Sequence, residues 1–215
     1  MNKPILSIET SSDLCSVALL NENQTFFSFD IRQKHVHSEK LILMIGSLLK
    51  TADVKLEDTA YIAVSMGPGS FTGLRIGLAA VKGLAFGAGI PICPVPTFDA
   101  FAYSISRYLP EKQTFVITRI VNRDELFFAR FEKRDDSYAV LNELQIIKKD
   151  ELTGYRKEND LLFGNYPAKQ KAVTDTDALS IAKWASVFGE RLLTREYDYL
   201  EPQYLKNFEG RKQNA

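Results

Sequence analysis

Hydrophobic and polar residues alternate over the first thirty positions in a way that is typical of β-strands. Segments 5–9, 14–20 and 25–31 are rich in β-branched and aromatic residues, and short polar turns separate them. Because the connections are so short, we expect these strands to form an antiparallel meander.

From residue 38 the apolar period lengthens to three and four residues. Leu41, Met44 or Ile45, Leu48 and Ala52 follow this spacing, which predicts a helix with Ser38 as its N-cap. Further segments are predicted as buried strands at 61–65 and 90–95, and as helices at 71–88 and 97–109, the second capped by Thr97. This order predicts an α/β unit with a mixed sheet.

After Pro110 strand-like segments predominate, at 114–121, 125–131, 138–147 and 161–163, before a helix at 177–193. We place a domain boundary near Leu109. The prediction is an N-terminal α/β subdomain over 1–109 with partner-docking helices, and a C-terminal α/β subdomain over 110–215. The last helix and tail are expected to pack back on the first subdomain. No internal repeat is visible.

Charge and cysteine content narrow the classes of function. Lysine plus arginine number 27, aspartate plus glutamate number 27, and the formal net charge is zero. This balance argues against the chain as the main surface that grips a nucleic acid, and mildly favours association with other proteins. Cys15 and Cys93 lack metal or disulfide spacing, and Arg75, Lys82 and Pro91 interrupt the most apolar stretch. We therefore expect a cytoplasmic protein without membrane contact.

The strongest local motif is Gly-Pro-Gly-Ser-Phe-Thr-Gly at residues 67–73, between a predicted buried strand and a predicted helix. Free N–H groups at a helix start favour an anion, and Ser70 or Thr72 can cap the helix. The motif lacks the lysine of a Walker loop, and a Rossmann fingerprint would require glycine at Thr72. Two interpretations stay open, phosphate binding and tight packing between strand and helix.

A second candidate site is the polar turn from Glu9 to Asp13. A carboxylate beside hydroxyl groups can hold Mg²⁺ and a phosphate, yet the same residue types are also ordinary turn formers. The candidate nucleotide- or phosphate-binding residues are therefore Glu9, Thr10, Ser11, Gly67, Gly69, Ser70, Thr72 and Gly73.

The two helices at 38–53 and 71–88 carry more apolar and small residues than one buried stripe requires. Interior helix glycines are destabilising, so their alignment on one face suggests close approach of another backbone. A partner interface and internal packing against the sheet are both consistent with this pattern. The candidate interface residues are Leu41, Met44, Ile45, Leu48, Gly73, Gly77, Ala80, Gly83 and Gly87.

Other candidate chemistry is weak. His35 and His37 lack further ligands nearby, so no metal site is predicted. No G-x-S-x-G motif is present, and no residue is assigned a catalytic role. Acidic residues interleave with a basic cluster, which predicts a solvated strand edge there. The cluster comprises Arg119, Arg123, Arg130, Lys133 and Arg134.

Three segments in order along the chain resemble the TsaB (YeaZ) family: Ile-Leu-Ser-Ile-Glu-Thr-Ser at 5–11, Gly-Pro-Gly-Ser-Phe-Thr-Gly-Leu-Arg-Ile-Gly at 67–77, and Glu-Pro-Gln-Tyr-Leu-Lys at 201–206. The resemblance implies an actin/Hsp70/sugar-kinase-like fold (ASKHA) of two α/β subdomains, each with a mixed sheet flanked by helices. Segment 120–127 departs from the family's Asp-Ala-Arg pattern, so the role of those residues is not carried over.

The resemblance also implies a function in threonylcarbamoyladenosine synthesis on tRNA, at the adenosine beside the anticodon. It implies a non-catalytic subunit that binds a catalytic TsaD-like subunit, with a TsaE-like ATPase, and that forms a homodimer when alone. Contact with tRNA would be indirect, through the complex. No tightly bound cofactor is expected, and at most weak or interface-shared ATP or ADP. The alternative is an ASKHA-type ATPase or phosphotransferase that acts on its own.

Overall fold

The computed structural model describes residues 3–167 and 173–203, and its first sheet has five strands in the order β3-β2-β1-β4-β5. Strands β1, β2 and β3 pair antiparallel, whereas β4 and β5 run parallel to β1. The strands are β1 (Ile5–Glu9), β2 (Leu14–Leu20), β3 (Phe26–Arg32), β4 (Tyr61–Ser65) and β5 (Ile92–Val95).

The second sheet repeats this arrangement with four strands in the order β8-β7-β6-β9. Here β6, β7 and β8 pair antiparallel, and β9 runs parallel to β6. The strands are β6 (Thr114–Ile120), β7 (Glu125–Arg134), β8 (Ser137–Lys148) and β9 (Leu161–Gly164). The fold therefore contains a topological repeat, although the sequence shows no internal repeat.

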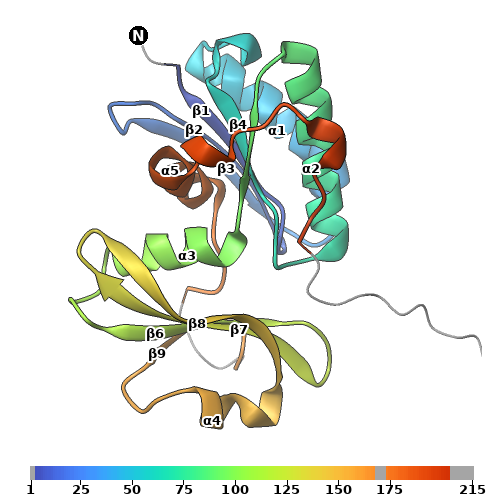
Figure 1. The fold of residues 1–215 in the computed structure, drawn as a ribbon. Coiled ribbons are helices and arrows are strands. Elements are labelled where there is room, and N and C mark those ends of the chain that lie inside the picture. The colour runs from blue at the N-terminus through green and yellow to red at the C-terminus, as the bar shows by residue number, and fades with distance from the viewer. Residues whose placement is uncertain (1–2, 168–172, 204–215) are drawn as a thin grey trace, which may run out of the picture.

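Helices cover both sheets (Figure 1). The first sheet has α1 (His37–Ala52) and α2 (Phe71–Ala88) on one face and α5 (Ala178–Phe188) on the other. Helix α3 (Thr97–Ser106) lies between the two sheets, and α4 (Leu152–Tyr155) covers the outer face of the second. Below, the first lobe is the first sheet with α1, α2 and α5, and the second lobe is the second sheet with α4.

Alternating side chains divide the core of the first lobe. Leu6 and Ile8 of β1 point toward α1 and α2, whereas Ser7 points toward α5 and donates to the Ala178 carbonyl at 2.6 Å. The period of two in the strands thus provides one apolar face for α1 and α2, and a second face for α5.

The predicted strands and long helices are confirmed, but several predicted ends are wrong. Helix α1 begins at His37, its N-cap position is Val36, and Ser38 does not cap it. Thr97 is not an N-cap either, because its hydroxyl accepts from the Gly67 N–H instead. The helix predicted at 177–193 ends at Phe188, where a Cβ on Gly189 would lie 2.6 Å from Cys93 Sγ.

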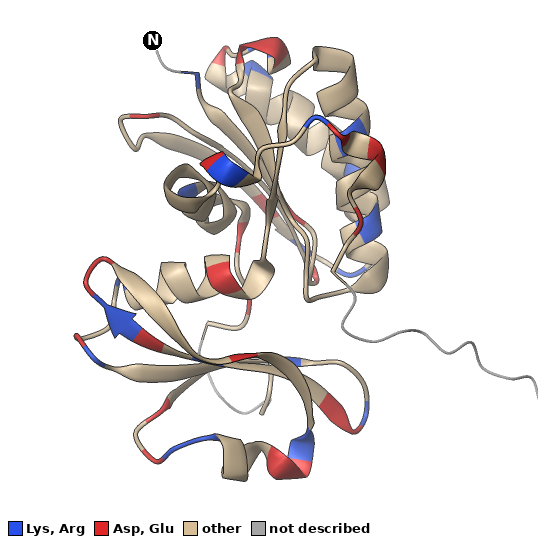
Figure 2. Cartoon of the chain, in the orientation of Figure 1, with Lys and Arg blue, Asp and Glu red and all other residues tan. Residues whose placement is uncertain are grey.

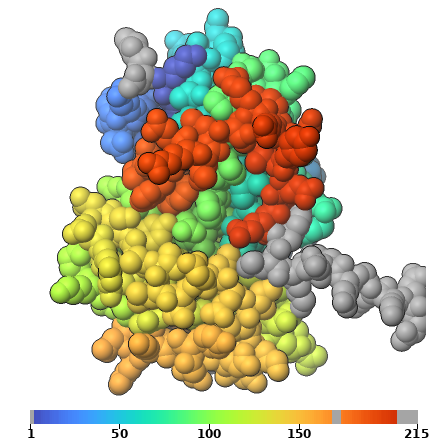
Figure 3. Space-filling view, viewed as in Figure 1, coloured from blue at the N-terminus to red at the C-terminus, as the bar shows by residue number. Residues whose placement is uncertain are grey.

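The chain returns to the first lobe after α5, and Figure 3 shows this red segment lying across that lobe. Thr194 pairs with Ile92 of β5, and the Tyr197 hydroxyl donates to the Ile90 carbonyl at 2.8 Å. The Gln203 N–H donates to the Met66 carbonyl at 2.7 Å. The motif at 201–206 is described only as far as Gln203.

The prediction that the basic cluster lies at a solvated strand edge is wrong for three of its five residues. Arg119, Arg130 and Lys133 are buried, because each has a carboxylate partner, in Asp175, Asp160 and Glu111 respectively. Cys15 and Cys93 are both buried free thiols, and burial raises their pKa values to about 11 and about 12.

Candidate functional site

The polar turn after β1 and the glycine loop before α2, far apart in sequence, lie directly against each other. The Ser70 N–H donates to the Ser11 carbonyl at 2.7 Å, and a Cβ on Gly69 would lie 2.5 Å from Ser11 Cβ. A Cβ on Gly73 would collide with the Thr10 carbonyl oxygen, and one on Gly77 with the Thr10 hydroxyl. Tight packing therefore accounts for these three glycines.

The loop also fixes the start of α2. The Ser70 hydroxyl accepts from the Gly73 N–H at 3.2 Å, which confirms Ser70 as the N-cap, while Thr72 is exposed. Gly67 has a φ of +108°, a backbone conformation that favours glycine. Thr97 holds it from both sides, since its hydroxyl accepts from the Gly67 N–H and its N–H donates to the Gly67 carbonyl.

Glu9 is a fully buried carboxyl at the base of this site. Its Oε1 accepts from the Ser11 N–H, whereas Oε2 and the neighbouring Thr10 and Ser65 hydroxyls have no hydrogen-bond partner within the described residues. Burial raises the pKa of Glu9, although the bonds from Ser11 and the charge of Arg119 oppose that rise. Unpartnered buried oxygens of this kind fit a bound water or another small ligand.

Two arginines and one aspartate complete the site, and none of them is among the candidate site residues predicted from the sequence. Arg119 of β6 donates through Nη1 to the Ser11 carbonyl at 2.9 Å and to the Ser11 hydroxyl at 2.8 Å. Its Nη2 lies 3.5 Å from Asp175 Oδ1, and Arg32 Nη1 lies 2.8 Å from Asp175 Oδ2. Local patterns could not identify these residues, because they meet only through the packing of the two lobes.

The structure places many of the predicted interface residues inside the first lobe. Leu41, Met44, Ile45 and Leu48 are buried against the sheet. As described above, Gly73 and Gly77 lie against Thr10, and Ala80 packs at the edge of the same core. These side chains serve internal packing, so their assignment to a partner surface is corrected.

The opposite side of α1 and α2 is a different surface, which we call the outer face. It consists of Ile42, Leu43 and Gly46 of α1 with Ala79, Gly83, Phe86 and Gly87 of α2. Leu43 and Phe86 are 64% and 77% exposed, and a Cβ on Gly46, Gly83 or Gly87 would meet no atom of residues 3–167 and 173–203 within 4 Å. Among the described helices only α2 is long and apolar enough to cross a membrane, yet just 33% of it is buried.

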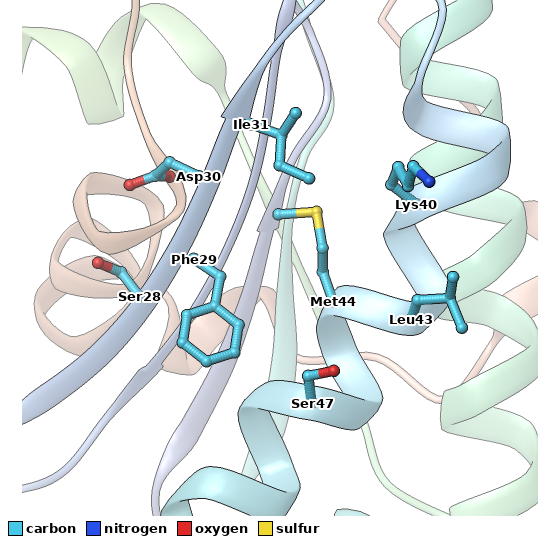
Figure 4. Close-up of a pocket in the computed structure, with 8 residues that line it drawn as sticks. All are labelled: Ser28, Phe29, Asp30, Ile31, Lys40, Leu43, Met44 and Ser47. Carbon is cyan, nitrogen blue, oxygen red and sulfur yellow. The ribbon is translucent and has the colours of Figure 1, made fainter.

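A hollow of about 530 Å³ adjoins the outer face, between β3 and α1 (Figure 4). Met44 extends toward Ile31 of β3, whereas Leu43 points away from the strand. The exposed Leu43 and the buried Met44 both line this hollow.

The two histidines do not come together with other ligands. His37 is buried with Nε2 at 3.3 Å from the Leu14 carbonyl oxygen, while His35 is exposed. Within residues 3–167 and 173–203, no group of three or more His, Cys, Asp or Glu residues could hold a metal ion.

Comparisons with known proteins agree with this architecture. Residues 31–175 match the family model for TsaD, tRNA N6-adenosine threonylcarbamoyltransferase. TsaB proteins of Escherichia coli (strain K12) and Haemophilus influenzae are each 31% identical, over 72% and 60% of this chain. These matches span 66% and 54% of the relatives' own lengths. A Pseudomonas aeruginosa crystal structure described as similar to peptidase YEAZ superposes with a TM-score of 0.80 at 24% identity, covering 96% of this chain and 100% of the other.

The second sheet repeats the order of the first four strands of the first sheet, and the two lobes meet at a polar turn; this architecture is an actin/Hsp70/sugar-kinase-like fold and confirms the expected fold class. Within that class, the two curated relatives named above are both TsaB proteins. The chain belongs to the TsaB (YeaZ) family.

Proposed function

We propose that this protein is a non-catalytic subunit in tRNA threonylcarbamoyladenosine biosynthesis, and that it binds a TsaD-type catalytic subunit through the outer face. The names of its relatives supply the pathway. The match to the TsaD family model fits a partner of that type.

The observation that carries the proposal is the exposed glycine and apolar content of the outer face. A helix glycine costs roughly 1 kcal/mol relative to alanine, and no contact among the described residues requires glycine at positions 46, 83 and 87. Small residues beside Ile42, Leu43 and Phe86 would let a partner helix approach closely and bury apolar area.

Charge supports the same surface. Figure 2 shows few charged residues on α2, where Arg75 and Lys82 are the charged side chains. Interface centres are typically poor in charge and rich in apolar residues. In the absence of the catalytic subunit, the same face would pair two copies of this chain.

The test is reconstitution with TsaD, TsaE, unmodified tRNA and threonylcarbamoyl-adenylate. Modification should fall to background when this chain is omitted, and should remain at background with Phe86→Asp, a variant of the exposed face. Equal modification without the chain would contradict the proposal. Tyr108→Asp serves as the matched surface control, because Tyr108 is an aromatic residue that is 85% exposed and lies after α3, outside α1 and α2.

The alternative, an ATPase or phosphotransferase acting alone, is favoured by one observation, the buried Glu9 carboxyl with its unpartnered oxygen. Against it, the backbone of Thr10 and Ser11 fills the space beside Gly69 and Gly73. ATP turnover by the purified chain that disappears in Glu9→Gln would favour the alternative. We expect no turnover and no tightly bound nucleotide.

A further inference from the structure

Arg119 is the side chain that joins the second lobe to the polar turn of the first. It is 6% exposed and lies on β6, and its Nη1 donates to both the carbonyl and the hydroxyl oxygen of Ser11. A charged donor that makes two hydrogen bonds in a buried site holds its acceptor in one position. The position of Ser11 therefore depends on the second lobe.

Ser11 in turn holds the start of α2. Its carbonyl oxygen accepts from Arg119 and also from the N–H of Ser70, the N-cap residue of α2, at 2.7 Å. The Ser11 N–H is bonded to Glu9, and its Cβ lies against Gly69, so the residue has no room to move independently. One carbonyl oxygen thus links β6 of the second lobe to the first turn of α2.

The carboxylate of Asp175 holds Arg119 in place. Burial opposes ionisation of Asp175, but the charge of Arg119 and the bonds from Arg32 and Thr174 hold the pKa of that carboxyl below its usual range. Asp175 therefore remains an anion that pairs with both arginines at neutral pH. Arg32 shares this carboxylate with Arg119, but no hydrogen bond between Arg32 and Ser11 is found in the described chain.

We infer that Arg119 is a positioning residue, which sets the first turn of α2 and so couples the second lobe to the outer face. This inference rests on the proposed function, because the proposed function assigns a TsaD-type partner to the outer face. A purely structural ion pair would stabilise the fold without changing the affinity of a surface that Arg119 does not touch.

The test compares Arg119→Met with Arg32→Met. Both variants remove one cation from Asp175, which keeps the other arginine, but only the first releases Ser11. We expect amide hydrogen exchange within residues 69–74 to become about tenfold faster in Arg119→Met, and the affinity for TsaD to fall about tenfold, within the usual range for coupled sites. Both quantities should stay within about twofold of the wild type in Arg32→Met.

Arg119→Lys provides a second variant in case Arg119→Met fails to fold. It keeps the charge beside Asp175 but cannot reproduce the guanidinium geometry, so it should show the same two changes at smaller size. Wild-type exchange and affinity in the folded Arg119 variant would overturn the inference, as would equal losses in Arg32→Met. If the wild-type chain does not bind TsaD, the proposed function fails, and unchanged exchange in Arg119→Met would separately reject the positioning role.

Discussion

Both sides of α2 carry glycines, but the surroundings of these glycines differ between the two sides. On the inner side, Gly73 and Gly77 touch the Thr10 residue of the polar turn, so that no side chain fits. On the outer face, a Cβ on Gly83 or Gly87 would have no atom of the described residues within 4 Å. Glycines on the inner side serve the fold, whereas those on the outer face meet nothing in the described part of the chain and suggest a function outside it.

The sharpest test of the inner side is Gly73→Ala. The added Cβ would collide with a backbone oxygen that cannot rotate away, so the free energy of unfolding should fall by about 3 kcal/mol. Urea unfolding measures this change. A variant as stable as the wild type would show that the turn can move, and would remove the distinction between the two sides.

On the outer face, Phe86→Ala should affect binding and leave stability nearly unchanged. Phe86 is 77% exposed and makes an edge-to-face ring contact with Tyr197 at 6.3 Å between centroids, so truncation changes the free energy of unfolding by no more than about 1 kcal/mol. Removal of an aromatic anchor from an interface weakens binding by about 2 kcal/mol, or about thirtyfold in Kd. Calorimetric titration with TsaD measures the affinity. A stability loss without a change in Kd would reverse the assignment of the two sides.

Asp175→Asn tests the polar network beneath the inner side. Because pairing lowers the pKa of Asp175 in the folded state, the carboxylate stabilises the protein above pH 3.8, and that contribution is lost as pH falls through the lowered pKa. The variant should be about 2 kcal/mol less stable at pH 7. Unfolding measured from pH 7 downward should show the difference closing in acid, and a constant difference would argue against the ion pair.

Glu9→Gln should have the opposite sign. Burial raises the pKa of Glu9, so the folded state binds a proton at this carboxyl more tightly than the unfolded state does. The resulting stabilisation is fully present below pH 4.5 and is lost as pH rises through the raised pKa. Glutamine keeps an acceptor for the Ser11 N–H and offers a donor to Ser65, so the variant should gain about 1 kcal/mol at pH 7. The same unfolding series should show this gain shrinking toward pH 4.5. A loss at pH 7 would mean that Glu9 is ionised and needed there.

The smallest expected effect is that of Gly83→Ala. Alanine is favoured over glycine in a helix, and nothing lies within reach of its Cβ, so the free energy of unfolding should rise by up to about 1 kcal/mol. Thermal unfolding measures it beside Gly73→Ala, which carries the same substitution on the other side. Destabilisation by Gly83→Ala would mean that position 83 has an internal role.

The sequence predicted most of the fold because its signals are local. The period of two in β1 to β3, the apolar run of β4 and the capped helix α2 follow from neighbouring residues. The ends of the helices were harder to predict, because they depend on contacts between residues that are far apart in sequence. Thr97 bonds to Gly67, and Gly189 lies against Cys93.

The candidate site was predicted only in part for the same reason. Glu9 to Ser11 and the 67–73 loop were recognisable from turn chemistry, whereas Arg119 and Asp175 join them only after the two lobes meet. The small-residue stripe on α2 was visible, but its spacing could not separate the inner residue Gly77 from the outer residue Gly83. That distinction depends on where Thr10 lies.

The most direct test of the outer face is the affinity of Gly83→Leu for TsaD, measured by calorimetric titration alongside its thermal unfolding. A Cβ at position 83 meets no atom of the described residues within 4 Å, and a leucine side chain there would occupy the room left for a partner helix. We predict a folded protein of at least wild-type stability whose Kd for TsaD rises about tenfold or more. A folded Gly83→Leu variant that binds TsaD with wild-type affinity would contradict this prediction.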